Sequence, residues 1–382
     1  MSILFEYDYL IVGGSLAADS AIKAIRKEDV NSTIGMLCDE PFPPYRRPAL
    51  SKHLWQEDDR SRIWLQTEKL NVDIMLSTKA VSLDPRNKTV TDNYGSEHSF
   101  DKLLIATGAS PRKMSPSCGD VHYFRNLSNF ENIRNASENA KEIVILGGGF
   151  IGFELAACLN EAGKSVTMIF PEEFLGSLIF PLELSRYLHD YYVSKGVTIL
   201  SGDVPETVVE SHGRRSITTR SGKILEADMV IASIGCIPNS DIALDAGLAV
   251  DNGIIVDENL NCGHPDIFAA GDVANFHSLV LNKRMRIEHA DNAVMMGRHA
   301  GLSMLGHRNV YGHIPGFYAD MFDQSLKAVG MIRSDMDIRV EWNVPLKEGT
   351  LYYSRENRIS GVLYWNMPAK LDTARSLITE GS

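Results

Sequence analysis

The feature that most constrains this 382-residue chain is a unit of strand, glycine turn and helix that occurs twice. In the first copy an apolar run at residues 7–12 leads into Gly13-Gly14-Ser15-Leu16-Ala17-Ala18. In the second copy the run at 141–146 leads into Gly147-Gly148-Gly149-Phe150-Ile151-Gly152. A helical pattern and then a β-branched stretch follow each turn. The sequence therefore predicts two βαβ units and two nucleotide-binding domains.

Each glycine in a dinucleotide turn has its own physical task. The first permits the tight turn, the second lets the backbone approach pyrophosphate, and the third lets the helix pack on the strand. The helix N-terminus then faces the phosphates. Gly147, Gly149 and Gly152 complete this pattern, whereas the first copy has Ser15 and Ala18 at the last two places. We interpret the first copy as a cofactor site in which the Ser15 hydroxyl reaches phosphate; the alternative is a simple strand–helix turn.

Acidic residues follow the second strand of each unit. Asp39 and Glu40 lie 26 and 27 residues after Gly13, close to the offset of about 20 at which a carboxylate binds ribose hydroxyls. In the second unit Glu172 is the first carboxylate, and no arginine occurs before Arg186, which favours NADH over NADPH. Surface caps are the alternative interpretation of Asp39 and Glu40.

Three more apolar runs end at a glycine, namely at Gly108, Gly235 and Gly271, as expected of strand ends that line a cleft. We expect an α/β fold with two Rossmann-like dinucleotide-binding domains. The first comprises residues 1–113 and 237–311, and the second comprises residues 114–236. Alternating strands after Tyr311 predict a small α+β C-terminal interface domain at 312–382.

Composition excludes several functional classes. With 38 Lys and Arg against 49 Asp and Glu, the net charge is -11, which opposes binding to nucleic acid or an anionic membrane. No run approaches the ~20 apolar residues of a spanning helix, and the start lacks the basic, then apolar pattern of a secretion signal. Five scattered cysteines suit a reducing cytosol, so we expect a cytoplasmic protein. His289 invites a metal hypothesis, but no metal site is expected, because clustered His and Cys spacing is missing.

A specific resemblance begins at Pro44-Tyr45-Arg46-Arg47-Pro48-Ala49-Leu50-Ser51-Lys52. It is similar to the P-Y-x-R-P-P-L-S-K segment of ferredoxin-reductase-like flavoproteins and apoptosis-inducing factor, with Ala49 in place of the second proline. Ala106-Thr107-Gly108, Ala270-Gly271-Asp272 and Glu288-His289-Ala290 follow in the family order. The segments around Phe150 to Glu154 and Pro171-Glu172 resemble apoptosis-inducing factor more closely. The resemblance implies an FAD-dependent pyridine nucleotide oxidoreductase with a glutathione-reductase-like fold.

The resemblance also implies roles for individual residues. Lys52 and Glu154 would form a catalytic pair, in which a fixed cation stabilises electron density on the reduced flavin. The alternatives are an exposed lysine and a helix-surface acid. Tyr318 falls where relatives often have tryptophan near the flavin. The residues expected to bind FAD are Gly13, Gly14, Ser15, Leu16, Ala17, Asp39, Glu40, Arg47, Lys52, Val81, Ala106, Thr107, Gly108, Arg125, Gly271, Asp272, Glu288, His289, Ala290 and Tyr318. Those expected to bind NAD are Gly147, Gly149, Phe150, Ile151, Gly152, Glu172 and Gly235.

Relatives that reduce disulfides carry a redox cysteine beside the flavin, but here the corresponding loop reads Arg46-Arg47-Pro48-Ala49. Cys38 precedes this loop and is interpreted as a packing residue. The first hypothesis is therefore an NADH-dependent reductase, a monomer or homodimer, that passes electrons from FAD to a small iron–sulfur carrier such as ferredoxin or rubredoxin. The second is an apoptosis-inducing-factor-like NADH oxidase with a long-lived reduced flavin. The third is a binding module without turnover, against which the complete second glycine turn argues.

Overall fold

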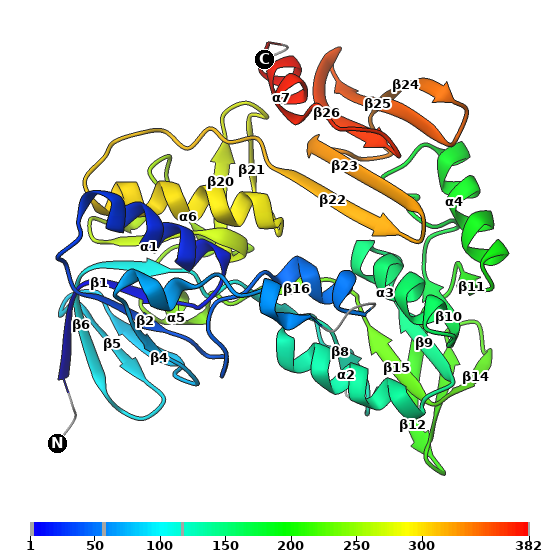
Figure 1. Ribbon diagram of the computed structural model, residues 1–382, viewed down its shortest axis with the longest axis horizontal. Coiled ribbons are helices and arrows are strands. Elements are labelled where there is room, and N and C mark those ends of the chain that lie inside the picture. Colours follow the sequence, from blue (N-terminus) through cyan, green and yellow to red (C-terminus); the bar gives the residue numbers. More distant parts are fainter. Residues whose placement is uncertain (1–3, 56–58, 116–117, 381–382) are drawn as a thin grey trace. The chain divides into compact units, whose positions relative to one another are not determined.

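The fold was analysed in a computed structural model, which describes residues 4–55, 59–115 and 118–380 (Figure 1). The chain forms two compact units. Unit 1 comprises residues 1–47, 60–110 and 237–315, and unit 2 comprises residues 48–59, 111–236 and 316–382. The chain passes between them within β7 (Ala109–Pro111) and β16 (Cys236–Pro238) and in the segments that follow Arg47, Asp59 and Pro315.

Unit 1 is organised around a mixed eight-stranded sheet. Its main path runs through β18 (Asn261–His264), β19 (Ile267–Ala269), β6 (Glu97–Ile105), β1 (Leu4–Val12), β2 (Ile34–Leu37) and β3 (Asp73–Met75). The hairpin of β4 (Ala80–Asp84) and β5 (Thr89–Asp92) joins β6, and β17 (Ile254–Ile255), β20 (Ala274–Ser278) and β21 (Lys283–Met285) form a separate sheet. The short helix α5 (Asp241–Asp245) also belongs to this unit. Parallel pairing of β1 with β2 and β6 places the ends of three strands at one edge.

Two long helices of unit 1, α1 (Leu16–Glu28) and α6 (Ala290–Met304), lie side by side (Figure 1). Their close approach depends on glycine, because a Cβ on Gly297 would lie 2.1 Å from the Ala17 carbonyl oxygen. A Cβ on Gly301 would likewise lie 2.6 Å from the Ala21 carbonyl oxygen. This packing fixes the start of α1, where the first glycine turn ends, against the middle of α6.

Unit 2 contains a parallel five-stranded sheet in the order β11 (Thr198–Ser201), β10 (Ser165–Phe170), β9 (Glu142–Leu146), β15 (Met229–Ala232) and β8 (His122–Tyr123). The helices α2 (Leu127–Asn139), α3 (Phe150–Glu161) and α4 (Leu182–Ser194) accompany it. A three-stranded antiparallel sheet follows, with β12 (Pro205–Ser211), β13 (Arg214–Thr219) and β14 (Ile224–Ala227).

The C-terminal part of unit 2 is an antiparallel sheet. Its order is β22 (Gly316–Met321), β23 (Gln324–Gly330), β26 (Arg358–Trp365), β25 (Glu348–Arg355) and β24 (Asp337–Val344). Helix α7 (Leu371–Glu380) packs against β23 and β26.

The α/β class predicted from the sequence is confirmed, and so are both strand–turn–helix units. Among the described helices, none combines the length and apolar character needed to cross a membrane. The division into three domains with the predicted boundaries stays a prediction.

Candidate functional site

The second glycine turn, in unit 2, connects β9 to α3. The backbone N–H of Gly147 donates to the Ile169 carbonyl at 2.9 Å, which ties the turn to the end of β10. Gly147 has φ +114°, and a Cβ there would lie 2.4 Å from the Ser233 carbonyl oxygen. A Cβ on Gly152 would lie 2.5 Å from the Gly147 carbonyl oxygen. The turn is therefore closed by backbone contacts that only glycine permits.

Gly149 differs from its neighbours in this turn. It is the residue before α3, it is exposed, and no described residue beyond its chain neighbours and its own helix lies within 4 Å of an ideal Cβ. The N-terminus of α3 thus presents unobstructed backbone N–H groups, which is the arrangement that binds pyrophosphate. The shape and chemistry of the turn fit a dinucleotide.

The first glycine turn, in unit 1, repeats this geometry between β1 and α1. The N–H of Gly13 donates to the Leu37 carbonyl at 2.9 Å, and Gly13 has φ +123°. A Cβ on Gly13 would lie 2.1 Å from the Ala106 carbonyl oxygen, at the end of β6. Leu16 and Ala17 are buried in the first turn of α1. Ser15 is the residue before the helix, in the place that Gly149 takes in unit 2.

Arg47 ties Ser15 to the acid that ends the second strand. Its Nε donates to Ser15 Oγ at 3.1 Å, and its Nη2 pairs with Glu40. Tyr45, which is buried, receives a hydrogen bond from Arg47 Nη1 at 3.1 Å and donates to Glu40 Oε2 at 2.6 Å. Three residues predicted to bind FAD are therefore brought together around one guanidinium. Asp39, by contrast, is exposed.

A second arginine contacts two further predicted FAD residues of unit 1. Arg286, whose side chain is only 8% exposed, pairs with Glu288 at 2.7 Å and donates to the Asp272 carbonyl at 3.1 Å. Its guanidinium is thus buried between these two predicted site residues. His289 precedes α6, and burial lowers its pKa to about 4, so its imidazole is neutral at pH 7.

The remaining predicted residues of unit 1 lie at strand ends and in the hairpin. The Thr107 hydroxyl donates to the Asn239 carbonyl at 2.7 Å, and the N–H of Asn239 donates to the Gly108 carbonyl at 3.0 Å. Gly271 has φ +80° beside Ala17. Val81 is half-exposed on β4, and Ala290 opens α6.

In unit 2, α3 places Glu154 at the centre of a polar network. Its carboxylate accepts hydrogen bonds from Ser51 Oγ at 2.5 Å and from the Asp320 backbone N–H at 3.2 Å, and it pairs with Lys52. The Glu154 side chain is 5% exposed and that of Lys52 13% exposed. The Lys52 ammonium also lies 4.8 Å from the centre of the Tyr318 ring. The alternatives of an exposed lysine and a helix-surface acid are therefore wrong.

Burial dominates the electrostatics of this network. It raises the pKa of Glu154 above the usual value, while Lys52, Ser51 and the Asp320 N–H oppose the shift by stabilising the carboxylate. Segments far apart in the chain meet here, because Ser51 and Lys52 come from the loop region after β2, Glu154 from α3, and Asp320 from β22. The result is a fixed, desolvated ion pair that borders an aromatic ring.

Two cysteines lie near the Pro44 to Lys52 segment, and burial suppresses the reactivity of both. Cys38 is 1% exposed, and burial raises its pKa to about 12. Cys158, one helical turn after Glu154, donates to the Ser51 carbonyl at 3.5 Å, and burial raises its pKa to about 12 as well. Both sulfurs are protonated at neutral pH and are poor nucleophiles.

The other NAD-site predictions fall around the second turn or in the sheet of unit 2. Phe150 opens α3 and its ring centre lies 4.9 Å from that of Phe317, while Ile151 is exposed. Glu172 follows β10, and Gly235 follows β15 with φ +92°. Arg125 lies just before the Asn126 cap of α2.

Sequence reasoning missed Ser51, the Asp320 N–H and the buried role of Arg286. Ser51 carried a signal, since it lies in the resemblance segment next to Lys52. The Asp320 N–H has no side-chain signature at all. Arg286 follows an exposed strand and two other cations, so its burial is visible only in the structure.

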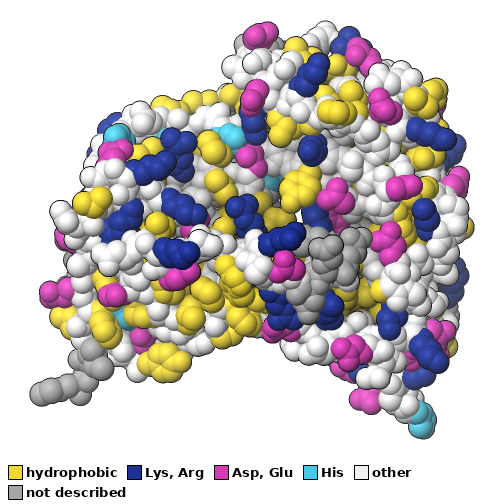
Figure 2. All heavy atoms as spheres, viewed as in Figure 1, with side chains coloured by type: hydrophobic (Ala, Val, Ile, Leu, Met, Phe, Trp, Pro, Cys, Tyr) yellow, Lys and Arg dark blue, Asp and Glu magenta, His cyan; other side chains and the backbone are white. Residues whose placement is uncertain are grey.

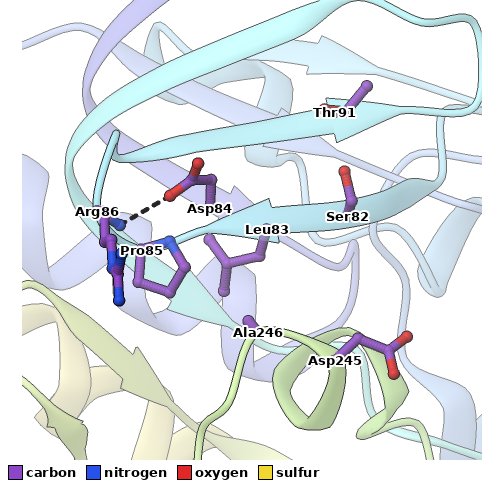
Figure 3. Close-up of a pocket in the computed structure, with 8 residues that line it drawn as sticks. All are labelled: Ser82, Leu83, Asp84, Pro85, Arg86, Thr91, Asp245 and Ala246. Atoms are coloured by element: carbon purple, nitrogen blue, oxygen red, sulfur yellow. Dashed lines mark hydrogen bonds between the residues drawn. The ribbon is translucent and has the colours of Figure 1, made fainter.

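A surface pocket of about 470 Å³ in unit 1 lies outside these groups (Figure 3). It is formed by the β4–β5 hairpin and the end of α5, with Asp84, Arg86 and Asp245 among its lining residues. The Asp84 carboxylate accepts the backbone N–H groups of Arg86 and Asn87 at 2.9 and 3.0 Å, as in an ordinary turn. Cationic and anionic side chains are interspersed on the face in Figure 2, and the described residues contain no cluster suited to a metal ion.

Comparison with known proteins agrees with this geometry. Apoptosis-inducing factor 1 of Dictyostelium discoideum is 30% identical over 98% of this chain and 78% of its own length. Putidaredoxin reductase of Pseudomonas putida is 28% identical over 97% of this chain and 91% of its own length. Among solved structures, the covalent complex of putidaredoxin reductase with putidaredoxin is 27% identical, with a TM-score of 0.91 over 98% of this chain and 93% of that chain.

These relatives confirm the predicted class of enzyme, an FAD- and NAD(H)-dependent oxidoreductase close to the ferredoxin and rubredoxin NAD reductases. Residues 7–297, more than half of the chain, match the family described as pyridine nucleotide-disulphide oxidoreductase. The protein belongs to the pyridine nucleotide-disulphide oxidoreductase family.

Proposed function

We propose that the protein oxidises NADH with bound FAD and passes the electrons singly to a small iron–sulfur carrier of the ferredoxin or rubredoxin type, in the cytoplasm. The observation that carries this proposal is the buried Lys52–Glu154 pair at the start of α3, next to the open glycine turn. The finer architecture belongs to the proposal too: residues 1–113 and 237–311 as a Rossmann-like FAD domain, 114–236 as a Rossmann-like NAD domain, and 312–382 as an interface domain.

The proposed FAD-binding groups of unit 1 follow from the geometry of the first turn. The N-terminus of α1 and Arg47 supply donors for pyrophosphate, with Ser15 Oγ holding the guanidinium in place. Glu40 is held at the end of the second strand, where ribose hydroxyls are bound in such folds. Arg286 fixes the Asp272 main chain and Glu288, so that one buried cation orients two proposed site residues. The full sets of FAD and NAD residues given above are retained as proposals.

In unit 2 the proposed nicotinamide dinucleotide site is the turn at Gly147, Gly149 and Gly152. Gly149 leaves room for pyrophosphate at the N-terminus of α3. Glu172, at the end of β10, is proposed to accept hydrogen bonds from the adenosine ribose, which favours NADH.

FAD, when bound, supplies a ring that accepts a hydride and releases electrons one at a time. The Lys52 ammonium is proposed to stabilise the negative charge that this reduction generates. Its position is set by Glu154 and by the Tyr318 ring, and Glu154 is set in turn by Ser51 Oγ and the Asp320 N–H. A charge that is already in place requires no reorganisation at the moment of reaction.

The chemistry of the thiols bears on the electron acceptor. Protonated, shielded thiols at Cys38 and Cys158 do not favour disulfide reduction. Relatives of comparable length are named as reductases of ferredoxin, putidaredoxin and rubredoxin. An oxidase of the apoptosis-inducing-factor type is kept as the second candidate, because a protein of that name is 30% identical over almost the whole chain.

Anaerobic stopped-flow absorbance tests the proposal. NADH should bleach the flavin spectrum faster than NADPH, and the reduced protein should reoxidise rapidly with a ferredoxin or rubredoxin and slowly with oxygen. Lys52→Met should slow bleaching, whereas the exposed-lysine control Lys347→Met should not. Slow reoxidation by every acceptor would favour the oxidase candidate, and a purified protein without flavin, even after FAD is supplied, would overturn both.

A further inference from the structure

Two hairpins of the C-terminal sheet in unit 2 have two-residue turns, and the residues in these turns fit them differently. Between β25 and β26 the turn is Glu356-Asn357, with φ +52° and +62°. Both residues are exposed, and asparagine is one of the residues that tolerate positive φ best. This turn follows the usual preferences of a two-residue hairpin.

The turn between β22 and β23 departs from these preferences. Its central residues are Phe322 and Asp323, of which only Phe322 has positive φ, at +56°. This is the φ pattern of a type II′ turn, in which glycine is usual at the first central position. A bulky residue at positive φ is a backbone outlier, and such outliers persist only where the surrounding structure holds them. Contacts outside the hairpin must therefore hold Phe322 in place.

Those contacts come from α4, toward which the tip of the hairpin points (Figure 1). The Phe322 ring meets the rings of Tyr191 and Tyr192 edge to face, with ring centres 5.9 and 5.1 Å apart. The Lys195 ammonium lies 5.6 Å from the centre of the same ring. The next residue of the turn, Asp323, accepts a hydrogen bond from the Tyr191 hydroxyl. Both residues of the turn are therefore bound at the end of α4.

These contacts lead back to the Glu154 network from two sides. Tyr192 is fully buried, and its hydroxyl donates to the carbonyl of Phe153, the residue before Glu154, at 3.0 Å. Asp320, two residues before Phe322 in the chain, donates its backbone N–H to the Glu154 carboxylate at 3.2 Å. The contacts thus close into a ring that runs through Glu154, Phe153, Tyr192, Phe322 and Asp320.

We propose that the Phe322-Asp323 turn is a positioning device for the Glu154–Lys52 pair. By packing on α4, the turn holds β22 where the Asp320 N–H reaches the Glu154 carboxylate. The same strand holds the Tyr318 ring 4.8 Å from the Lys52 ammonium. This inference rests on the proposed function, because the position of the pair matters to the reaction only if the pair acts in flavin reduction.

The choice of residue at position 322 favours positioning over simple chain reversal. Glycine there would relieve the backbone outlier, but it would lose the contacts with both tyrosine rings. A turn that only joined β22 to β23 would be served by glycine. What phenylalanine adds is the contact with α4, and through Tyr192 that contact reaches the residue next to Glu154.

Phe322→Gly tests the proposal in the flavin-loaded protein. The hydrogen-exchange rate of the Asp320 amide, measured by NMR, should rise at least about tenfold, because two aromatic contacts that hold β22 are lost. The limiting rate of flavin reduction by NADH should fall about three- to tenfold with an unchanged KM, since the glycine turn at Gly149 is not disturbed. Tm should change little, because relief of the positive φ offsets part of the lost packing.

Three further variants separate the contact with α4 from the turn itself. Phe322→Tyr keeps a ring and should behave as the wild type. Tyr191→Phe keeps every ring but removes the hydrogen bond to Asp323, so it should change both the exchange rate and the reduction rate by about threefold, in the same directions. Glu356→Gly, at the exposed turn of the same sheet, should leave both rates unchanged.

Wild-type exchange at Asp320 in Phe322→Gly would overturn the positioning role and leave the proposed function untouched. Equal acceleration of exchange in Glu356→Gly would overturn it as well, because the effect would then be a general loosening of the sheet. Faster exchange with a wild-type rate of reduction would also overturn it, and if Glu154→Gln then reduces at the wild-type rate too, the proposed function fails with it. If Phe322→Gly does not fold, the same two rates in Tyr191→Phe decide the question.

Discussion

The two glycine turns share a backbone plan and differ in the side chains on it. In both, the first glycine has positive φ and abuts a carbonyl oxygen, of Ala106 in unit 1 and of Ser233 in unit 2. In both, its N–H donates to the end of the second strand at 2.9 Å. The turns differ at their third residue. The space beside Gly149 is empty of described residues, whereas Ser15 receives a hydrogen bond from Arg47. Close backbone contacts thus require glycine at the first residue of each turn. The third residue meets no such restriction, so a side chain with a hydrogen-bonding group can stand there.

The buried acids of the two helices show the same contrast. Asp19 in α1 pairs with Lys23, one turn later in the same helix, and accepts from the Thr67 hydroxyl at 2.7 Å. Glu154 in α3 is bound by Ser51, Lys52 and the Asp320 N–H, all distant in sequence. We interpret the local acid as structural and the distant one as part of the reaction site. Substitutions at matched positions test this contrast.

The largest effect is expected from Gly13→Val and Gly147→Val. Each places a Cβ within 2.4 Å of a backbone oxygen and forces a β-branched residue to positive φ. The cost should be about 3 kcal/mol or more, combining strain with a clash that backbone atoms cannot relieve. Thermal unfolding should show a large fall in Tm or no soluble protein. Gly163→Val is the control, because Gly163 also has positive φ (+79°) but no described residue beyond its chain neighbours lies within 4 Å of an ideal Cβ there. An equal loss of stability in this variant would refute the role of the clash.

The next largest effect is expected from Gly149→Glu, which places a charged side chain in the open position of the second turn. The KM for NADH should rise at least about tenfold, or ~1.4 kcal/mol, while FAD stays bound and Tm hardly changes. Gly149→Ala is the matched control, since its Cβ has free space among the described residues. Unaltered reduction by NADH in the glutamate variant would remove the second turn from the dinucleotide site.

Substitution of Glu154 should change the rate of flavin reduction, whereas substitution of Asp19 should change the stability of the fold. Glu154→Gln should slow flavin reduction by about tenfold or more, or ~1.4 kcal/mol of barrier, because Lys52 loses the partner that positions it. Asp19→Asn should instead lower Tm and leave the rate per bound flavin unchanged. Similar slowing in both variants would contradict the division into structural and reactive acids.

A pH series sharpens the same prediction. Burial holds the folded pKa of Glu154 above its unfolded value, which is about 4.3. The folded state therefore binds this proton more tightly than the unfolded state. The contribution of Glu154 to stability is greatest at pH values below its unfolded pKa, and it declines as pH rises through the folded pKa. Glu154→Gln should remove this decline from a plot of unfolding free energy against pH.

Much of this site could be predicted because its residues occur in short, ordered segments. The glycines of both turns, the Arg47 to Lys52 segment and Glu154 all carry local patterns that reflect local backbone requirements. What the sequence could not reveal depends on distant contacts. The Asp320 N–H on Glu154 has no residue-type signal, and the burial of Arg286 results from packing by the Asn252 loop and the Asp272 main chain.

A smaller effect is expected at Ser15. Ser15→Ala removes the acceptor of the Arg47 Nε hydrogen bond, which should raise the Kd of FAD about three- to tenfold, in line with ~0.5–1.5 kcal/mol for one hydrogen bond. Fluorescence recovery of released FAD measures this. Ser15→Gly, which recreates the pattern of the second turn, tests whether the hydroxyl or the lack of a side chain matters. Equal affinity in all three proteins would make Ser15 a neutral replacement of glycine.

The smallest effect is expected at Cys38. Its sulfur would lie 2.4 Å from a Cβ on Gly14, and in the second turn a Cβ on Gly148 would likewise lie 2.9 Å from Phe170. The cysteine therefore occupies the place of a packing phenylalanine, and burial keeps its thiol protonated. Native protein should resist alkylation at Cys38 by iodoacetamide, as mass spectrometry can measure, and Cys38→Ala should reduce at the wild-type rate. Because a redox thiol must be an accessible thiolate during turnover, rapid modification with loss of activity would instead align this protein with the disulfide reductases.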